Sequence, residues 1–232
     1  MNTHPTANSS FLKVYWWKIL AVLLIIYTIA AGFILEVPRL AILNETIRNL
    51  YFHVTMWFGM MIILLVSMIY SIKYLSSLSI EDDIIASETA NVGIFLGILG
   101  LLTGMVWAYF TWGDWWVPDA KLNGAAITLL IYLAYIILRN SMDEEQKRGR
   151  VAAVYNIFSY IMLIVFLMIL PRMTDSLHPG NGGNPGFGGY DLNDNMKLVF
   201  YPAIIGWTLL GVWLVNLRVR IKKIERKINE ND

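Results

Sequence analysis

The chain has 232 residues, of which 57% are apolar and 15% are charged, and its formal net charge is +1. Soluble domains are about 45–50% apolar and about 25% charged, so this composition excludes an ordinary soluble domain and indicates an integral membrane protein. Because the chain contains no cysteine, thiol–disulfide exchange and thiolate-bound metals are excluded as well.

Six apolar runs could cross a bilayer, whose hydrocarbon core of about 30 Å needs about 20 helical residues. The expected transmembrane helices lie near residues 16–35, 51–72, 90–111, 123–138, 152–170 and 198–217. The fourth of these runs is the shortest. We therefore predict an all-α integral membrane protein in which residues 1–232 form one membrane domain, a bundle of six transmembrane helices.

The basic residues predict the orientation, because cytoplasmic connections retain an excess of Lys and Arg. With the N-terminus inside, thirteen of the 18 basic residues fall on inner segments and five on outer ones. Both termini are therefore predicted to be cytoplasmic, with outer segments at 36–50, 112–122 and 171–197. The glycine-rich run at 179–189 predicts a flexible loop, and the basic run at 218–227 predicts an extension of the last helix against anionic lipid headgroups.

Two of the three histidines lie at the predicted outer boundary. His53 begins the second span and His178 follows the fifth, whereas His4 lies in a polar tail where we expect it to be inert. A neutral imidazole can be an axial ligand of haem iron. Taken singly, each boundary histidine is explained better as a hydrogen-bonded residue at a helix end. A shared ligand site is favoured when both are considered with the tryptophan-rich segment on the same face.

The third span carries four glycines on one helical stripe, namely Gly93, Gly97, Gly100 and Gly104. Small residues at this spacing let a neighbouring helix approach closely. We prefer this packing interpretation to a groove for a flat ligand.

Residues 112–122, between the third and fourth spans, form a tryptophan-rich segment. Its indoles belong to Trp112, Trp115 and Trp116. An indole is a large flat apolar surface that suits either a membrane interface or a flat ligand. An aromatic belt does not require the intervening Gly113, Asp114 and Asp119, so we favour the ligand wall. A cap at the start of the fourth span would also explain Asp119.

Haem b makes three demands that this outer face could meet. It needs flat apolar walls, one or two axial donors, and cations or hydrogen-bond donors for its propionates. The tryptophans of residues 112–116 would be the walls, and His53 and His178 would be the metal ligands. The candidate propionate partners are Arg48, Lys121 and Arg172.

The tryptophan-rich segment resembles a haem-handling motif of membrane proteins of cytochrome c biogenesis. It reads Trp-Gly-x-x-Trp-x-x-Asp at 112–119, and it is accompanied by Arg48-x-x-Tyr51-x-His53 and by Leu177-His178. Six spans, this length and two outer histidines are similar to the cytochrome c maturation protein C family, also called haem exporter protein C.

The resemblance implies a protein that presents haem at the outer face of the bacterial cytoplasmic (inner) membrane, and not an enzyme or a pump with its own energy source. It implies delivery to a periplasmic haem chaperone, cytochrome c maturation protein E, in association with an ATP-binding-cassette complex of maturation proteins A and B. The other expected partner is the lipid bilayer, and no nucleic acid is expected. Carried over to this chain, the axial ligands are His53 and His178, the motif residues are Trp112, Gly113, Trp115, Trp116 and Asp119, and the arginine upstream of the first histidine is Arg48.

The chain departs from the family pattern at Pro118 and Lys121, where the family usually has Trp and Arg. Aromatics expected shortly before the second histidine are also missing, with Met173 and Thr174 near those positions. Because an ammonium lacks the forked geometry of a guanidinium, Lys121 weakens any bidentate carboxylate contact there.

Two other functions remain open from the residues alone. A membrane haem b electron carrier typically holds its haem between spans through histidines inside helices, and no predicted helix interior contains one. A haem-free scaffold subunit would use the outer aromatics to bind lipid or another subunit.

Overall fold

The computed structural model describes residues 7–39, 43–178 and 192–230, with side chains described from residue 13 onward. These residues contain helices and no strand, and six helical stretches are long and apolar enough to span a membrane. The prediction of an all-α, multi-pass membrane protein is confirmed. His4 and the glycine-rich run at 179–189 lie outside the described residues.

The spanning helices are α1 (Ala7–Ile34), α2 (His53–Ser77), α3 (Ile80–Trp112), α4 (Ala120–Asn140), α5 (Glu145–Ile164) and α7 (Asp194–Asn229). A 3₁₀ helix, η1 (Asn44–Tyr51), leads into α2. The fifth span continues from α5 through a π-helical turn, η2 (Val165–Ile169), into α6 (Leu170–Met173).

Most of these helices are longer than the apolar runs that predicted them. Helix α3 begins at Ile80 instead of near residue 90, and α7 ends at Asn229 instead of near 217. The apparently short fourth span is the 21-residue α4. Charged residues mark the limit of an apolar run, but the helix can continue through them. In this structure the charged residues at the start of α3 and the end of α7 pair with charges on neighbouring helices.

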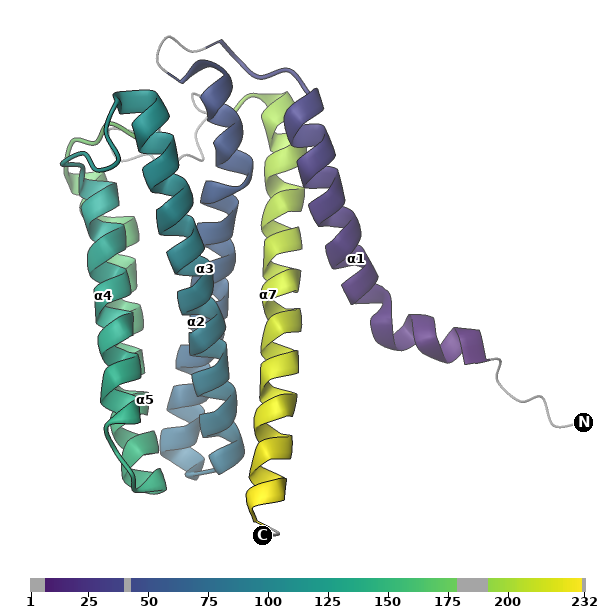
Figure 1. The fold of residues 1–232 in the computed structure, drawn as a ribbon, viewed down its shortest axis with the longest axis vertical. Helices are drawn as coiled ribbons and strands as arrows, with labels where there is room; N and C mark the ends of the chain where they lie inside the picture. Colours follow the sequence, from purple (N-terminus) through teal and green to yellow (C-terminus); the bar gives the residue numbers. More distant parts are fainter. Residues whose placement is uncertain (1–6, 40–42, 179–191, 231–232) are drawn as a thin grey trace, which may run out of the picture.

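Helix α2 is the centre of the bundle and packs against α3, α5 and α7 (Figure 1). Helix α1 packs along α7, and its N-terminal part diverges from the bundle. Both described termini point toward the same end of the bundle in Figure 1, as an even number of spans requires. Met60, Ile63 and Leu64 of α2 are almost fully buried in the main core cluster.

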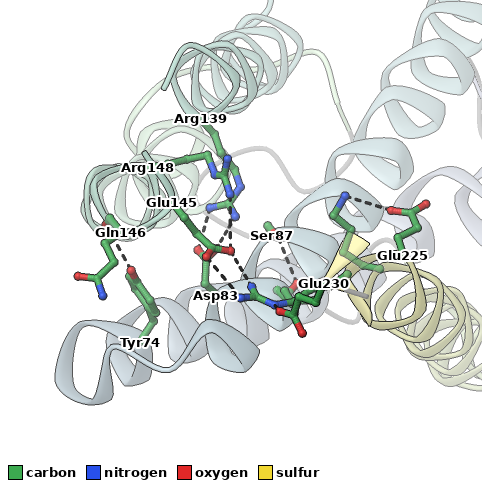
Figure 2. A network of polar contacts seen from close by, with 12 residues as sticks. Tyr74, Asp83, Ser87, Arg139, Glu145, Gln146, Arg148, Glu225 and Glu230 are labelled. Carbon is green, nitrogen blue, oxygen red and sulfur yellow. Dashed lines mark hydrogen bonds and ion pairs between the residues drawn. The ribbon is translucent and has the colours of Figure 1, made fainter. Parts of the chain in front are cut away.

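We call the end that carries the termini the ion-pair end. Its ion pairs are Lys73–Asp82, Arg139–Asp83, Arg218–Glu88, Lys223–Glu81 and Arg226–Glu145. Figure 2 shows Arg139 of α4 donating two hydrogen bonds to Asp83 of α3, at 2.8 and 2.5 Å. In the same view the Tyr74 hydroxyl of α2 reaches the Gln146 carbonyl of α5. Side chains from α2, α3, α4, α5 and α7 thus tie this end together.

The basic run at 218–227 extends α7 as an unbroken helix, as its sequence predicts. Its partners are different from those expected. Arg218 and Lys223 pair with acids of α3, and Arg226 pairs with Glu145 of α5. The extension therefore joins α7 to α3 and α5 by ion pairs, and lipid headgroups are not the sole partners of its cations.

The glycine stripe of α3 confirms the packing interpretation. A Cβ atom added at Gly93 would lie 2.4 Å from Leu64, and one at Gly97 would lie 2.7 Å from Leu129 of α4. Such contacts do not occur between real atoms, so these side chains occupy the space that glycine leaves. The last glycine, Gly104, leaves room for the ring of His53 in the same way.

Candidate functional site

A cleft opens at the end of the bundle opposite the ion pairs, which we call the cleft end. It has a volume of about 1110 Å³, counting the part open to solvent. Helix α2 packs against α5, but within the described residues no Cα atom of α2 lies within 8 Å of one in η2 or α6. The two helices therefore separate, and α4 stays with η2 and α6 on the far side. The separation creates the cleft.

Both candidate ligand histidines line this cleft. His53 comes from the first turn of α2, and His178 comes from the connection after α6. The remaining walls are largely apolar and come from α2, α3, α4, η2 and α6. Residues separated by more than half of the sequence thus meet at one site, as the shared-ligand interpretation requires.

His53 is held by the backbone of α3. Its Nδ1 lies 2.9 Å from the Gly100 carbonyl oxygen and 3.1 Å from Thr103 Oγ1. A carbonyl oxygen can only accept, so Nδ1 must carry the proton and Nε2 must carry the lone pair. The ring also makes edge contacts with Trp57 and Trp107, with centroids 6.3 and 5.8 Å away. This histidine is fixed in the tautomer that a metal ligand at Nε2 needs.

His178 is held by Asp119 in a corresponding way. Its Nδ1 lies 2.8 Å from Asp119 Oδ1. The same carboxylate accepts hydrogen bonds from the Ser176 hydroxyl at 2.8 Å and from the Leu177 amide at 2.7 Å. It also caps α4 by accepting from the amides of Lys121 and Leu122. The capping role considered for Asp119 is confirmed, and the carboxylate additionally fixes the second histidine.

The surroundings of Asp119 keep it ionised. Burial by itself would raise the pKa of this carboxyl, but the hydrogen bonds from His178, Ser176 and Leu177 hold the pKa below its ordinary value. An ionised carboxylate can only accept a hydrogen bond, so His178 donates through Nδ1. In the neutral imidazole, Nε2 is then the nitrogen with the lone pair.

The tryptophan-rich segment divides into two parts. The ring of Trp112 contacts the ring of His178, with centroids 4.9 Å apart. Trp115 stacks on Tyr109 at 4.7 Å, and Trp116 donates to Asn123 Oδ1 at 3.2 Å. These last two indoles are 49% and 39% exposed. None of the three indoles lines the cleft itself, and Trp112 adjoins it through His178.

Gly113 lies between the two parts and ends α3. Its φ angle of +85° is readily adopted only by glycine, and its amide donates to the Tyr109 carbonyl oxygen. The turn at Gly113 directs the segment away from the axis of α3.

The three candidate propionate partners are not equivalent. Lys121 and Arg172 line the cleft, whereas Arg48 does not. Arg48 donates from Nη1 to the carbonyl oxygens of Gly32 and Leu35, at 2.8 and 2.6 Å, and from Nε to Glu45. A guanidinium at a helix C-terminus satisfies carbonyls that have no helical partner. In this structure Arg48 anchors the end of α1 to η1.

Trp57 and Trp107 line the cleft beside His53 and were not among the predicted site residues. The sequence does contain a signal for each. Trp57 follows His53 by one helical turn, and Trp107 continues the spacing of the glycine stripe through Gly100 and Gly104. The Trp107 indole donates to Thr46 Oγ1 at 3.2 Å and so joins α3 to η1.

The two histidines of the cleft suit a metal whose other ligands come from a bound macrocycle. The described residues contain no group of three or more His, Cys, Asp or Glu side chains that could hold a bare metal ion. Two imidazoles in a largely apolar cleft fit an iron whose other four ligands come from a macrocycle. Two cations on the walls could take the two carboxylates of such a molecule.

Comparisons with known proteins agree with this chemistry. A family model described as "Heme exporter protein C" matches residues 3–232. The chain is similar to Heme exporter protein C of Bradyrhizobium diazoefficiens, with 27% identity over 63% of this chain and 55% of that protein. The protein of the same name from Escherichia coli is 25% identical over 60% of this chain and 54% of its own length. Cytochrome c biogenesis protein CcsA of Prochlorococcus marinus is 38% identical over 39% of this chain and 28% of its own length. The alignments thus span about half the length of the first two relatives and about a quarter of the third.

Proposed function

Because this chain belongs to the Heme exporter protein C family, we propose that it binds haem in the cleft and takes part in cytochrome c maturation. In this proposal haem is cargo that the protein holds and passes on. The cleft end faces the periplasm, both termini are cytoplasmic, and the protein lies in the cytoplasmic membrane of a bacterium. The recipient is a periplasmic haem chaperone, cytochrome c maturation protein E, and the ATP-binding-cassette complex of maturation proteins A and B acts with it.

The proposal rests on one observation, which is that both histidines donate through Nδ1. Each donates its Nδ1 proton to an oxygen of the protein, the Gly100 carbonyl for His53 and the Asp119 carboxylate for His178. Each therefore offers Nε2 as an acceptor, and both side chains line one cleft. Two interfacial histidines with unrelated structural roles would have no reason to share this arrangement.

Other residues at the cleft suit the porphyrin ring and the propionates of haem. Trp57 and Trp107 lie beside His53, and Trp112 lies beside His178, so that indoles flank both axial positions. Lys121 and Arg172 supply positive charge at the cleft, and we assign them to the propionates. Haem b, whose vinyl groups are unmodified, is the form expected for cargo that has not yet been attached to a cytochrome.

The test is whether haem copurifies with the protein through these histidines. Wild-type protein expressed with sufficient haem should show a Soret band with the features of two axial imidazoles. Each of His53→Ala and His178→Ala removes one donor and should change the spectrum, and the double variant should lose the band. His4→Ala is the matched control and should leave the spectrum unchanged. A folded double variant that retains the full Soret band would refute the proposed site.

A further inference from the structure

The cleft continues below the histidines along purely apolar walls. On α2 it is lined by Val54, Phe58 and Met61, and on the facing side by Leu167 and Met168 of η2. At a helical rise of about 1.5 Å per residue, Met61 lies about 12 Å deeper than His53. With His53 at the membrane boundary, this lower part of the cleft is at the depth of lipid acyl chains.

The lower cleft borders the lipid-facing surface on both of its sides. On α2, Phe58 and Met61 adjoin Ile62 and Leu65, which are 39% and 36% exposed. On η2, Met168 adjoins Ile169, which is 45% exposed. Within the described residues no Cα atom of α2 lies within 8 Å of one in η2 or α6, so the two backbones stay apart between these two edges.

The π-helical turn contributes to this separation. Pro171 lacks an amide proton and cannot donate to the turn before it, which favours a local widening of the helix at η2. The widened turn packs against α4, where a Cβ atom on Gly124 would lie 2.4 Å from the Phe166 carbonyl oxygen. Glycine at this position therefore allows η2 to lie close to α4 and away from α2.

The two levels of the cleft differ in chemistry. The cations and the histidines lie at the upper level, whereas the described residues that line the lower level have no polar side chain. A bare charge brought through the lower level would be costly, but a flat apolar molecule would not be. Haem has an apolar body and one charged edge, so a haem in the outer leaflet would keep its propionates near the headgroups and its body among the acyl chains.

We propose that the gap between α2 and η2–α6 is a lateral entrance through which haem moves from the outer leaflet into the cleft. The entrance rests on the proposed function for the identity of the cargo. Its walls are Phe58 and Met61 on one side and Leu167 and Met168 on the other. Haem passes between these walls. Its propionates stay at the membrane surface and move toward Lys121 and Arg172.

Single cysteines test whether the entrance faces lipid, because the natural chain has no cysteine. In proteoliposomes Met168→Cys should react with a lipid-soluble maleimide, and bound haem should protect it. Its neighbour Ile169→Cys, on the lipid-facing surface, is the matched control and should react whether or not haem is bound. A Met168→Cys protein that the reagent does not label, or that haem does not protect, would overturn the entrance.

A bulky side chain tests whether haem uses this route. Met168→Trp should slow the loading of haem from the bilayer about tenfold, as expected for a barrier higher by about 1.4 kcal/mol. The slowing should be larger for haem supplied in the bilayer than for haem supplied in detergent, and Ile169→Trp should load at the wild-type rate. Unchanged loading by Met168→Trp would overturn the entrance alone, whereas wild-type protein that binds no haem in detergent would overturn the proposed function as well.

Discussion

The two ends of the helix bundle satisfy their polar groups in opposite ways. At the ion-pair end charged side chains bond to one another across helices, as Asp83 does to Arg139 and Glu88 to Arg218. Deeper in the same half, the Asn156 amide of α5 donates to Ser67 and Ser71 of α2. At the cleft end, in contrast, His53 and His178 are each held through Nδ1, and Nε2 is the nitrogen that we propose binds haem iron.

This difference separates stability from binding. Helix α2 is joined to α5 by hydrogen bonds in one half. In the other half its backbone lies apart from η2 and α6 within the described residues. A bundle that is tied at one end can stay open at the other without losing its topology. We therefore expect substitutions at the ion-pair end to change the free energy of unfolding, and substitutions at the cleft end to change haem binding.

The largest effect is expected for Arg139→Met. It would leave Asp83, whose side chain is only 8% exposed, as a buried charge without its bidentate partner. Removing one member of a buried pair typically costs about 3–5 kcal/mol. The free energy of unfolding, measured with denaturant in detergent micelles, should fall by about this amount, while protein that remains folded should show a normal Soret band.

The matched control for Arg139→Met is Lys223→Met. The pair between Lys223 and Glu81 is largely exposed, and such pairs are worth about 0–1 kcal/mol. Equal effects of the two substitutions would contradict the assignment of stability to the buried pair. Loss of haem affinity in folded Arg139→Met protein would contradict the separation of the two ends.

The sequence predicted the helices, and it predicted that His53 and His178 lie at the same end of the bundle, because both features leave strong local signals. Six apolar runs specify six spans, and charge counting placed His53, His178 and residues 112–122 on one face. Asp119 and Trp112 were selected as parts of a haem-binding motif, and in the structure both contact His178. Their part in haem binding stays a prediction. Each of these residues lies near the end of a spanning helix. Its position in the sequence therefore predicts at which end of the bundle it lies.

The contacts across helices could not be predicted in the same way. Arg48 was selected for its charge, but its hydrogen bonds to the end of α1 depend on how η1 packs. The acids that precede residue 90 interrupt the apolar pattern, and only their partners on other helices explain why α3 includes them. Trp115 and Trp116 are tryptophans like Trp112, but they do not contact His178. The turn at Gly113 directs the chain away from α3, so Trp115 stacks on Tyr109 and Trp116 donates to Asn123.

A smaller effect is expected for Asp119→Asn, which tests how the cleft end holds its second histidine. Asparagine is as good an N-cap as aspartate, so α4 should keep its stability. It lacks the charge that holds His178 through Nδ1, and the loss of such a partner typically costs about 10–100-fold in metal affinity. Haem titration followed at the Soret band should show a weakening of this size.

The control for Asp119→Asn is Asn193→Ala, which removes the N-cap of α7. It should lower the free energy of unfolding by about 0.5–2 kcal/mol and leave haem affinity unchanged. If Asp119→Asn behaved like Asn193→Ala, the carboxylate would be a helix cap and nothing more.

The smallest effect distinguishes the tryptophans within the cleft end itself. Trp112 contacts the ring of His178, and such an aromatic contact is worth about 0.5–1.5 kcal/mol, so Trp112→Ala should weaken haem binding about two- to tenfold. Trp115 stacks on Tyr109 outside the cleft, so Trp115→Ala should leave the haem affinity and the axial-ligand spectrum unchanged. The two variants remove the same side chain from the same segment, and titration with haem compares them directly. Equal weakening would mean that the whole segment closes over the ligand, and the division between the indole that contacts His178 and the exposed indoles would then be wrong.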